Sequence, residues 1–226
     1  MVSETGVAES GYLPAGNFSA WLHQTRNAQL TKGTTNVKCD ACVGCCTSSY
    51  FIHIGPDESQ TLQFIPKQLL FPAPGLPKGH VLMGYDEKGH CPMLIDGTCS
   101  IYEHRPQTCR SYDCRVFPAA GIQAGDADKE PINQRISRWK FNYPTKRARA
   151  EHAAVHAAAQ FLREHANCFP IGVLPGNPAQ LAVLAIKVYE VFVDQKPASS
   201  DRARTNAEIA DAVMAKLRQI DAGYIT

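Results

Sequence analysis

The spacing of the cysteines constrains this chain more than any other feature of its sequence. Eight of the nine cysteines fall in two groups, Cys39-x2-Cys42-x2-Cys45-Cys46 and then Cys91, Cys99, Cys109 and Cys114. Two-residue gaps allow a tight turn to bring successive sulfurs round one centre, as in zinc knuckles and iron–sulfur loops. Neighbouring side chains diverge, so the adjacent pair Cys45-Cys46 indicates either a bridge between two sites or one ligand beside one buried thiol. The spacing predicts that all eight cysteines are metal ligands.

The second group lies in a segment with two different local signals. Asp96-Gly97 is a strong turn pair between Met93 and Tyr102, which predicts a short hairpin with Cys91 and Cys99 flanking the turn. Pro106 is suited to the first turn of a helix, which would then carry Cys109. A hairpin and a short helix that converge on a cysteine loop would form an irregular metal cradle.

A disulfide framework is the main alternative explanation for so many cysteines. It requires an oxidising compartment, but the first 16 residues are polar and contain no apolar segment typical of a secretory signal. We therefore expect a cytoplasmic protein, in which clustered thiols stay reduced and serve metal or redox chemistry. Cys168 lies far from both groups, and we expect it to be a small buried hydrophobic residue.

The cysteine segments resemble the family named for a C-x2-C-x2-C-C signature and described as zinc- or iron-chelating. The matching residues are Cys39, Cys42, Cys45, Cys46, Cys91-Pro92-Met93-Leu94, Cys99-Ser100-Ile101-Tyr102-Glu103, Arg105-Pro106 and Cys109-Arg110. The resemblance covers roughly residues 35–118, with Cys114 outside its firmest part. It implies that Arg105 and Arg110 are outer partners that orient the ligands. The same segments are similar to flagellin lysine N-methylases, which implies a cluster-bearing enzyme that acts on protein lysine.

The sequence leaves the identity of the metal open. Eight thiolates divide evenly into two tetrahedral zinc sites, whereas a [4Fe–4S] cluster also takes four cysteines. His90 or His104, beside the second group, could replace one thiolate. Buried thiolates carry excess negative charge, but Lys38 and Arg115 are expected to be solvated basic residues rather than counter-charges.

A bound metal contributes about as much free energy as the whole stability of a small domain. We therefore expect the cysteine region to need its metal in order to fold.

The remaining sequence predicts an α+β protein, with a small irregular cysteine-rich core and hairpin packed against a mainly helical C-terminal half. We expect an N-terminal tail and helix over 1–33, the metal-binding domain over 34–118 and a helical region over 119–226. Predicted helices begin at Asn17 and span 57–65, 133–141, 145–166, 177–195 and 207–220, a strand covers 80–85, and a loop covers 119–131.

Several function classes lack support in the sequence. No Walker loop, G-x-G-x-x-G or G-x-S-x-G is present, and His152 and His156 lack the glutamate of a zincin between them. The net charge of +2 and the absence of an apolar run of roughly 20 residues favour neither nucleic acid nor membrane as a partner. Three hypotheses are left: a non-catalytic zinc- or iron-binding protein, an iron–sulfur enzyme whose catalytic residues are unknown, and a zinc-stapled module that binds a protein partner.

Overall fold

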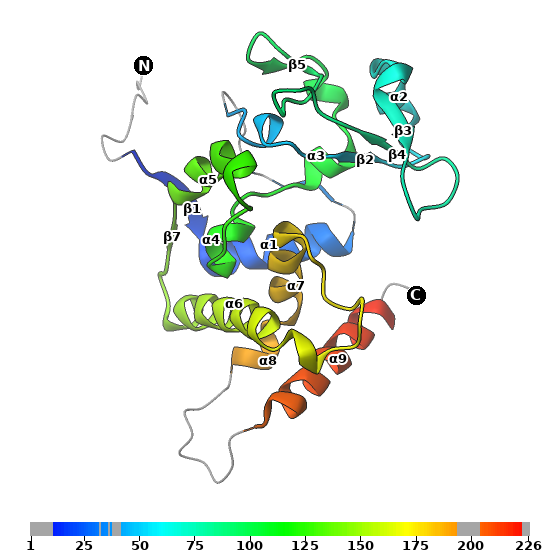
Figure 1. The fold of residues 1–226 in the computed structure, drawn as a ribbon. Coiled ribbons are helices and arrows are strands. Elements are labelled where there is room, and N and C mark those ends of the chain that lie inside the picture. The colour runs from blue at the N-terminus through cyan, green and yellow to red at the C-terminus, as the bar shows by residue number, and fades with distance from the viewer. Residues whose placement is uncertain (1–10, 32, 36, 38–41, 194–203, 223–226) are drawn as a thin grey trace.

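The computed structural model describes residues 11–31, 33–35, 37, 42–193 and 204–222. Cys39 and Lys38, both named in the sequence predictions, lie outside the described residues. The described chain is α+β, as predicted, with helices and three small sheets. Figure 1 shows the hairpin, the three-stranded sheet and helices α2 and α3 at one end of the molecule, and α6, α7, α8 and α9 at the other.

The larger hydrophobic core lies among the helices. The elements around it are β1 (Leu13–Asn17), α1 (Phe18–Leu30), α4 (Val116–Ala120), α5 (Glu130–Ser137), β7 (Trp139–Asn142), α6 (Lys146–Glu164), α7 (Pro178–Val188), α8 (Glu190–Val193) and α9 (Asn206–Ala222). Helix α6 packs against α1, α4, α7 and α8, and its alanine-rich face lets these neighbours approach closely. Phe18, Phe117 and Val155 are completely buried there, so this half is held by ordinary apolar packing.

The cysteine-rich end has a second, smaller core. Antiparallel strands β2 (Ile52–Ile54), β4 (Val81–Met83) and β3 (Leu70–Pro72) form its sheet, and β5 (Leu94–Ile95) pairs with β6 (Thr98–Cys99). Two short helices, α2 (Ser59–Phe64) and α3 (Gln107–Ser111), accompany them. The buried apolar residues of this core are Ile54, Ile65, Met83, Met93 and Ile101. Such a short list gives this end much less apolar stabilisation than the helical end has.

Three of the longer helices begin with the expected capping chemistry. The side chains of Asn17, Thr145 and Asn177 accept hydrogen bonds from backbone N–H groups in the first turns of α1, α6 and α7. The hairpin is also where the sequence places it, with positive φ at both Asp96 and Gly97. None of the helices in the described chain is long and apolar enough to cross a membrane.

Three local predictions differ from the structure. The expected loop over 119–131 is present but shorter, because α4 runs to Ala120 and α5 begins at Glu130. The expected helix over 133–141 ends at Ser137, because Trp139–Asn142 becomes a strand that pairs in parallel with β1. The expected helix over 177–195 is divided at Tyr189 into α7 and α8. The pairing of β1 with β7 joins segments more than 100 residues apart, which local periodicity does not reveal.

Candidate metal centre

Six of the predicted ligands line one cavity of about 480 Å³, whose wall is formed by residues between 42 and 112. The thiol-bearing residues on its wall are Cys42, Cys45, Cys46, Cys91, Cys99 and Cys109. Aromatic and aliphatic side chains make up most of the remaining wall, and Arg105 adds a positive charge. The fold therefore brings together cysteines from both sequence groups.

The first cysteine group is shaped by a short 3₁₀ turn, Cys45–Thr47. The hydroxyls of Thr47 and Ser48 donate to the carbonyls of Val43 and Gly44, at 3.0 and 2.5 Å, and hold this turn closed. A Cβ on Gly44 would lie 3.4 Å from the carbonyl oxygen of a residue at the start of α5, at ordinary contact distance, so the turn lies against that helix. The turn thereby fixes where the Cys45 and Cys46 side chains begin.

A backbone hydrogen bond ties the two cysteine groups together. The N–H of Cys91 donates to the carbonyl of Cys46 at 2.7 Å. Asp86 closes the loop just before it, since its carboxylate accepts the backbone N–H groups of Lys88 and His90. In the following hairpin, Cys99 pairs with Leu94 across the strands. The hairpin therefore delivers Cys91 and Cys99 to the same cavity wall.

Helix α3 supplies Cys109 and is anchored at its first turn. Glu58 accepts the N–H of Gln107 at 2.5 Å, and the hydroxyl of Thr108 donates to the carbonyl of His53 at 2.7 Å. Arg105 lines the cavity, with its guanidinium 3.5 Å from the centroid of the Tyr102 ring. Arg110 instead contacts Glu58 and Gln107 and does not line the cavity.

Four of the thiols influence one another electrostatically. Burial raises the pKa of Cys109 to about 12, with further contributions from Cys91, Cys46 and Cys99. Burial also raises the pKa of Cys91 to about 11, with Cys46 and Cys99 adding to the effect, and it raises the pKa of Cys99, where Cys46 contributes. Every pair within this set is thus close enough for charge on one sulfur to disfavour charge on another. We call Cys46, Cys91, Cys99 and Cys109 the cavity tetrad.

Cys46 differs from the other members of the cavity tetrad. A hydrogen bond from the Cys45 thiol lowers its pKa to about 7, opposed by burial and aided by the positive charge of Arg105. Cys46 is therefore the member of the tetrad that most readily becomes a thiolate near neutral pH. Without a cation the other three favour the neutral thiol, so metal binding has to displace their protons.

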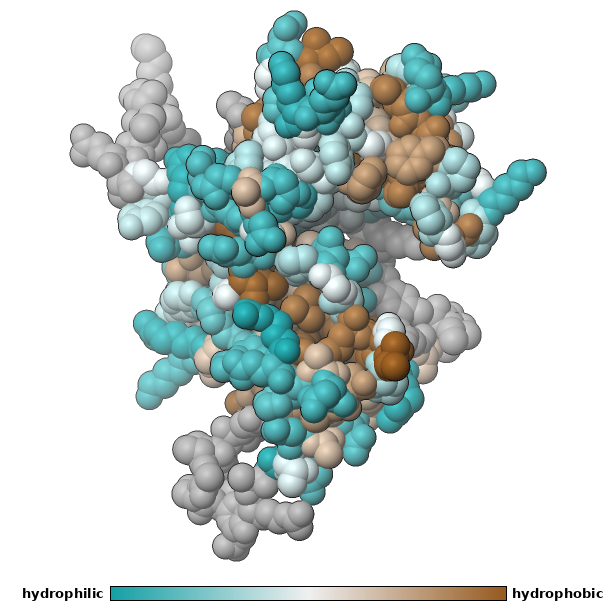
Figure 2. Space-filling model, viewed as in Figure 1, coloured by the Kyte–Doolittle hydropathy of each residue, from teal (hydrophilic) through white to brown (hydrophobic). Residues whose placement is uncertain are grey.

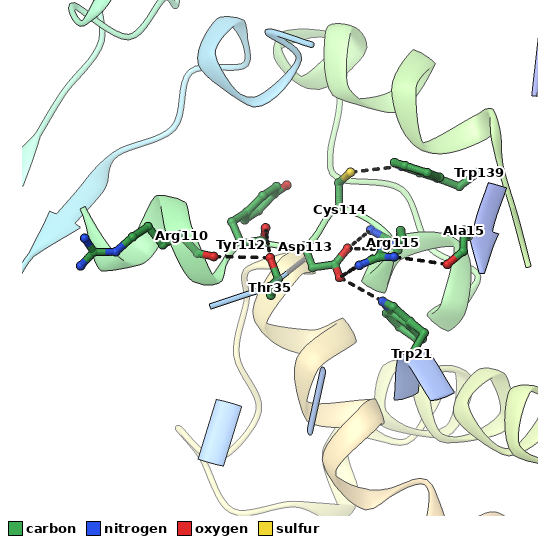
Figure 3. A network of polar contacts seen from close by, with 9 residues as sticks. All are labelled: Ala15, Trp21, Thr35, Arg110, Tyr112, Asp113, Cys114, Arg115 and Trp139. Atoms are coloured by element: carbon green, nitrogen blue, oxygen red, sulfur yellow. Dashed lines mark hydrogen bonds and ion pairs between the residues drawn. The ribbon is translucent and has the colours of Figure 1, made fainter. Parts of the chain in front are cut away.

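Cys114, the ligand least supported by the sequence, lies apart from the large cavity. It is buried in the helical core, where the indole N–H of Trp139 donates to its sulfur at 3.2 Å (Figure 3). Burial raises the pKa of Cys114 to about 12, and the charges of Asp113 and Cys42 act in the same direction. Cys114 thus has Cys42, from the first cysteine group, as an electrostatic neighbour.

The residues on either side of Cys114 form a buried ion pair. Arg115 donates to Asp113 at 2.7 Å, and the indole N–H of Trp21 donates to the same carboxylate at 2.9 Å (Figure 3). Arg115 also reaches the carbonyl of Ala15 at 3.2 Å. The prediction of a solvated Arg115 is therefore wrong, because Asp113, two residues away, neutralises its charge in the interior.

Two cavity residues, Tyr50 and Tyr112, were absent from the sequence predictions. Their hydroxyls are 3.5 Å apart, and burial raises the pKa of both. Tyr50 follows the predicted ligand Cys46 by four residues, and Tyr112 follows Cys109 by three. This closeness in sequence is the signal that could have identified them. The histidines proposed as substitute ligands do not line the cavity, and the His104 ring instead stacks on Phe64 with the ring centroids 3.8 Å apart.

Cysteine thiolates are suitable ligands for a metal group, but the described side chains are not arranged around the position of a single ion. Among the described side chains, no group of three or more His, Cys, Asp or Glu residues is arranged so that it could hold a metal ion as it stands. Four sulfurs that share one zinc at 2.3 Å would lie only about 3.8 Å from one another. The cavity tetrad lines a space of about 480 Å³, so the donor set also suits a larger thiolate-bound group.

Comparison with known protein families agrees with this donor set. Residues 38–135 match the model of the family described as "CxxCxxCC: Putative zinc- or iron-chelating domain". We refer to residues 38–135 as the CxxCxxCC domain after this similarity. The CxxCxxCC domain includes all eight clustered cysteines and the first part of helix α5, which packs against the first group. Searches of curated proteins and of solved structures each found no significant match. The family description supports metal binding by the domain.

Proposed function

We propose that the CxxCxxCC domain holds an iron–sulfur cluster through the cavity tetrad. The observation that carries this proposal is that four mutually interacting thiols from three separate segments line one cavity of about 480 Å³, which has room for a group larger than a single ion. In a [4Fe–4S] cluster each thiolate binds a different iron, so the sulfurs lie farther apart than around one zinc. Such a cluster supplies one-electron redox chemistry.

The protein around the cavity supports a negatively charged group. Arg105 on the cavity wall offsets thiolate charge and already favours ionised Cys46. The cavity wall is mainly apolar, and the polarity around the sulfurs is one of the factors that set the potential of a thiolate-held cluster. The residues around the cavity would therefore bind the cluster, compensate its charge and surround it with apolar side chains.

The test is metal and sulfide analysis of protein purified without oxygen and without added metal. We expect iron and acid-labile sulfide in equal amounts, with broad absorption near ~400 nm. Cys46→Ser and Cys109→Ser should lose most of both, whereas the matched control Cys168→Ser, outside the CxxCxxCC domain, should keep them. Zinc without sulfide in the wild-type protein would contradict the cluster and leave a zinc-stapled module, whose helical half would then be examined for a protein partner.

A second candidate function is a cluster-bearing enzyme, and the size of the cavity favours it. Small-molecule sites typically measure about 300–1,000 Å³, a range that includes this cavity. Phe51, at its rim, is 55% exposed and contacts the exposed rings of Phe71 and Tyr85. Figure 2 shows apolar surface over this end of the molecule, where α2 and β3 lie. A substrate side chain could enter past this rim.

The similarity of the cysteine segments to lysine N-methylases gives this second candidate a concrete assay. The cluster-loaded protein is incubated with S-adenosylmethionine and a lysine-rich flagellin peptide, and the peptide is analysed by mass spectrometry. Addition of one methyl group per modified lysine, absent from the Cys46→Ser variant, is expected if the enzyme hypothesis holds. An unchanged peptide mass with fully loaded protein would count against methyl transfer to lysine.

A further inference from the structure

The backbone segments that carry Cys46 and Cys91 lie side by side. The N–H of Cys91 donates to the carbonyl of Cys46 at 2.7 Å, and the N–H of Ser49 donates to the carbonyl of Gly89 at 2.9 Å. In the chain that the structure describes, no other backbone hydrogen bond outside the helices and strands joins two cysteines. These bonds place a cysteine of the first group directly beside one of the second.

The junction between these two segments is tight. Gly89 is buried and has a φ of 79°, and a Cβ at this position would clash with the Ser49 hydroxyl. Ser49 itself has a φ of 52°, which residues other than glycine rarely adopt. Strained backbone of this kind persists only where the surrounding structure holds it in place. The separation of Cys46 from Cys91 is therefore fixed by the backbone itself.

The two cysteines are suitably placed for a bond between their sulfurs. In an antiparallel ladder, residues that exchange backbone hydrogen bonds have Cα atoms about 5.5 Å apart, and disulfides span Cα separations of about 4.4–6.8 Å. The hydrogen bond between Cys91 and Cys46 brings their backbones to a comparable approach. Both residues line the large cavity, so their side chains face the same space, and both are partly exposed.

We propose that Cys46 and Cys91 form a reversible disulfide when the metal-free cavity is exposed to a peroxide. The disulfide would withdraw two of the four thiols of the cavity tetrad, a consequence that rests on the proposed function. Transient disulfides are the form in which redox-sensing proteins of reducing compartments use paired thiols. The pair would thus make the supply of ligands depend on the oxidant.

The oxidation takes place in two balanced steps. The Cys46 sulfur attacks one oxygen of hydrogen peroxide, so that an S–O bond forms, the O–O bond breaks and the thiol proton leaves with the released oxygen as water. The Cys91 sulfur then attacks the sulfenic sulfur, which forms the S–S bond and releases the second oxygen as water. The two thiols lose two electrons in total, and a dithiol reductant returns them. The cavity wall includes the exposed residues Phe51, Thr98 and Tyr102, so a small oxidant has access to the pair.

The test uses the reduced, metal-free, full-length chain, treated at neutral pH with one equivalent of hydrogen peroxide. We expect the thiols counted after denaturation to fall by two from the nine present per chain, and dithiothreitol to restore them. Mass spectrometry of the alkylated and digested chain should find Cys46 linked to Cys91. Cys46→Ser and Cys91→Ser should each lose this link, whereas the matched controls Cys42→Ser and Cys99→Ser, which also change a thiol of the cavity wall, should keep it.

A second variant tests the geometry while keeping every cysteine. Gly89→Ala should push the two segments apart and slow formation of the link at least about 10-fold, because reaction within a folded chain depends on close positioning. An unchanged rate would contradict the role assigned to this junction. If Gly89→Ala fails to fold by circular dichroism, the serine variants still decide the question.

Several results would overturn the disulfide: no loss of thiols, a link between Cys45 and Cys46 instead, or a link between two chains. Co²⁺, whose thiolate complexes absorb in the near-ultraviolet, should give weaker absorption with the oxidised chain than with the reduced one, and equal absorption would contradict the loss of ligands. Metal and sulfide analysis of the untreated protein tests the proposed function separately. Absence of iron there would contradict the cluster and leave the disulfide intact.

Discussion

His152 is a half-buried titratable side chain at the junction of several elements. Its ring contacts that of Phe18 in a tilted arrangement with centroids 4.4 Å apart, and its Nδ1 is 2.7 Å from the Tyr143 hydroxyl. Its Nε2 faces the carbonyl of Pro118 at 3.4 Å, as does the Nε2 of His156 at 3.3 Å. Burial first, and then the charge of His156, lowers the pKa of His152 to about 4. The ring therefore packs as a neutral aromatic group.

This environment predicts a loss of stability in mild acid. The unfolded state takes up a proton at His152 near pH 6.5, whereas the folded state does so only near pH 4, so stability falls as the pH drops between these values. We expect this residue to contribute a fall of about 1–2 kcal/mol between pH ~7 and pH ~5. Urea denaturation of wild type and His152→Phe at both pH values measures it, with exposed His23→Gln as control. An equal pH dependence in His152→Phe would contradict the assignment.

At the scale of elements, the segment from Cys109 to Arg115 joins the cysteine-rich end to the helical core. Cys109 is in α3, and after it the chain turns inward so that Asp113 and Arg115 are buried against Trp21 of α1 (Figure 3). Thr35 also meets this segment, through the carbonyls of Arg110 and Tyr112. This set of buried hydrogen bonds fixes how the Cys109 helix is oriented relative to the core.

Removing one partner of the buried pair should therefore be costly. Asp113→Asn leaves the Arg115 charge buried without a counter-ion, and we expect it to lower the free energy of unfolding by about 3–5 kcal/mol. The double variant Asp113→Asn/Arg115→Met should regain part of that loss, because the unpaired charge is gone. Arg26→Gln, which breaks an exposed pair with Glu190, serves as control and should cost at most about 1 kcal/mol. If Asp113→Asn and Arg26→Gln lower the free energy of unfolding by similar amounts in denaturation experiments, the buried Asp113–Arg115 pair does not have the stabilising role assigned to it.

The elements that could be predicted from sequence are those with local signals. The helix now labelled α6 was expected over 145–166 and runs over Lys146–Glu164, because its alanine-rich pattern and the Thr145 cap are local. Strand β7 could not be predicted in the same way, since Trp139–Asn142 becomes a strand only by pairing with β1. Among candidate site residues, spacing located the cysteines of the large cavity, whereas Tyr112 and Trp139 require the fold, which brings them to sulfurs from other segments.

At the scale of the whole molecule, the two ends depend on different sources of stability. The helical end has a continuous apolar core, in which α6 and α7 contact each other and each contacts α1 and α4. The cysteine-rich end has a small core and a cavity of about 480 Å³ where metal would lie. A cavity that size, ringed by thiols, offers few apolar contacts to offset the entropy of ordering its loops. Metal binding is therefore expected to supply the missing stabilisation at this end.

Metal removal should accordingly loosen one end and spare the other. After treatment with chelator and reductant, we expect amide hydrogen exchange to accelerate at least about 10-fold in peptides covering 42–54 and 91–111. Peptides from α6 and α7 should change far less, because their buried alanines and valines do not contact the cavity. The helical signal in far-ultraviolet circular dichroism should be mostly retained.

The Cys46→Ser variant should resemble the chelated protein at the cysteine-rich end, and Cys168→Ser should resemble the untreated one. Simultaneous loss of protection in α6 and in the hairpin would show instead that the two cores unfold as a single unit.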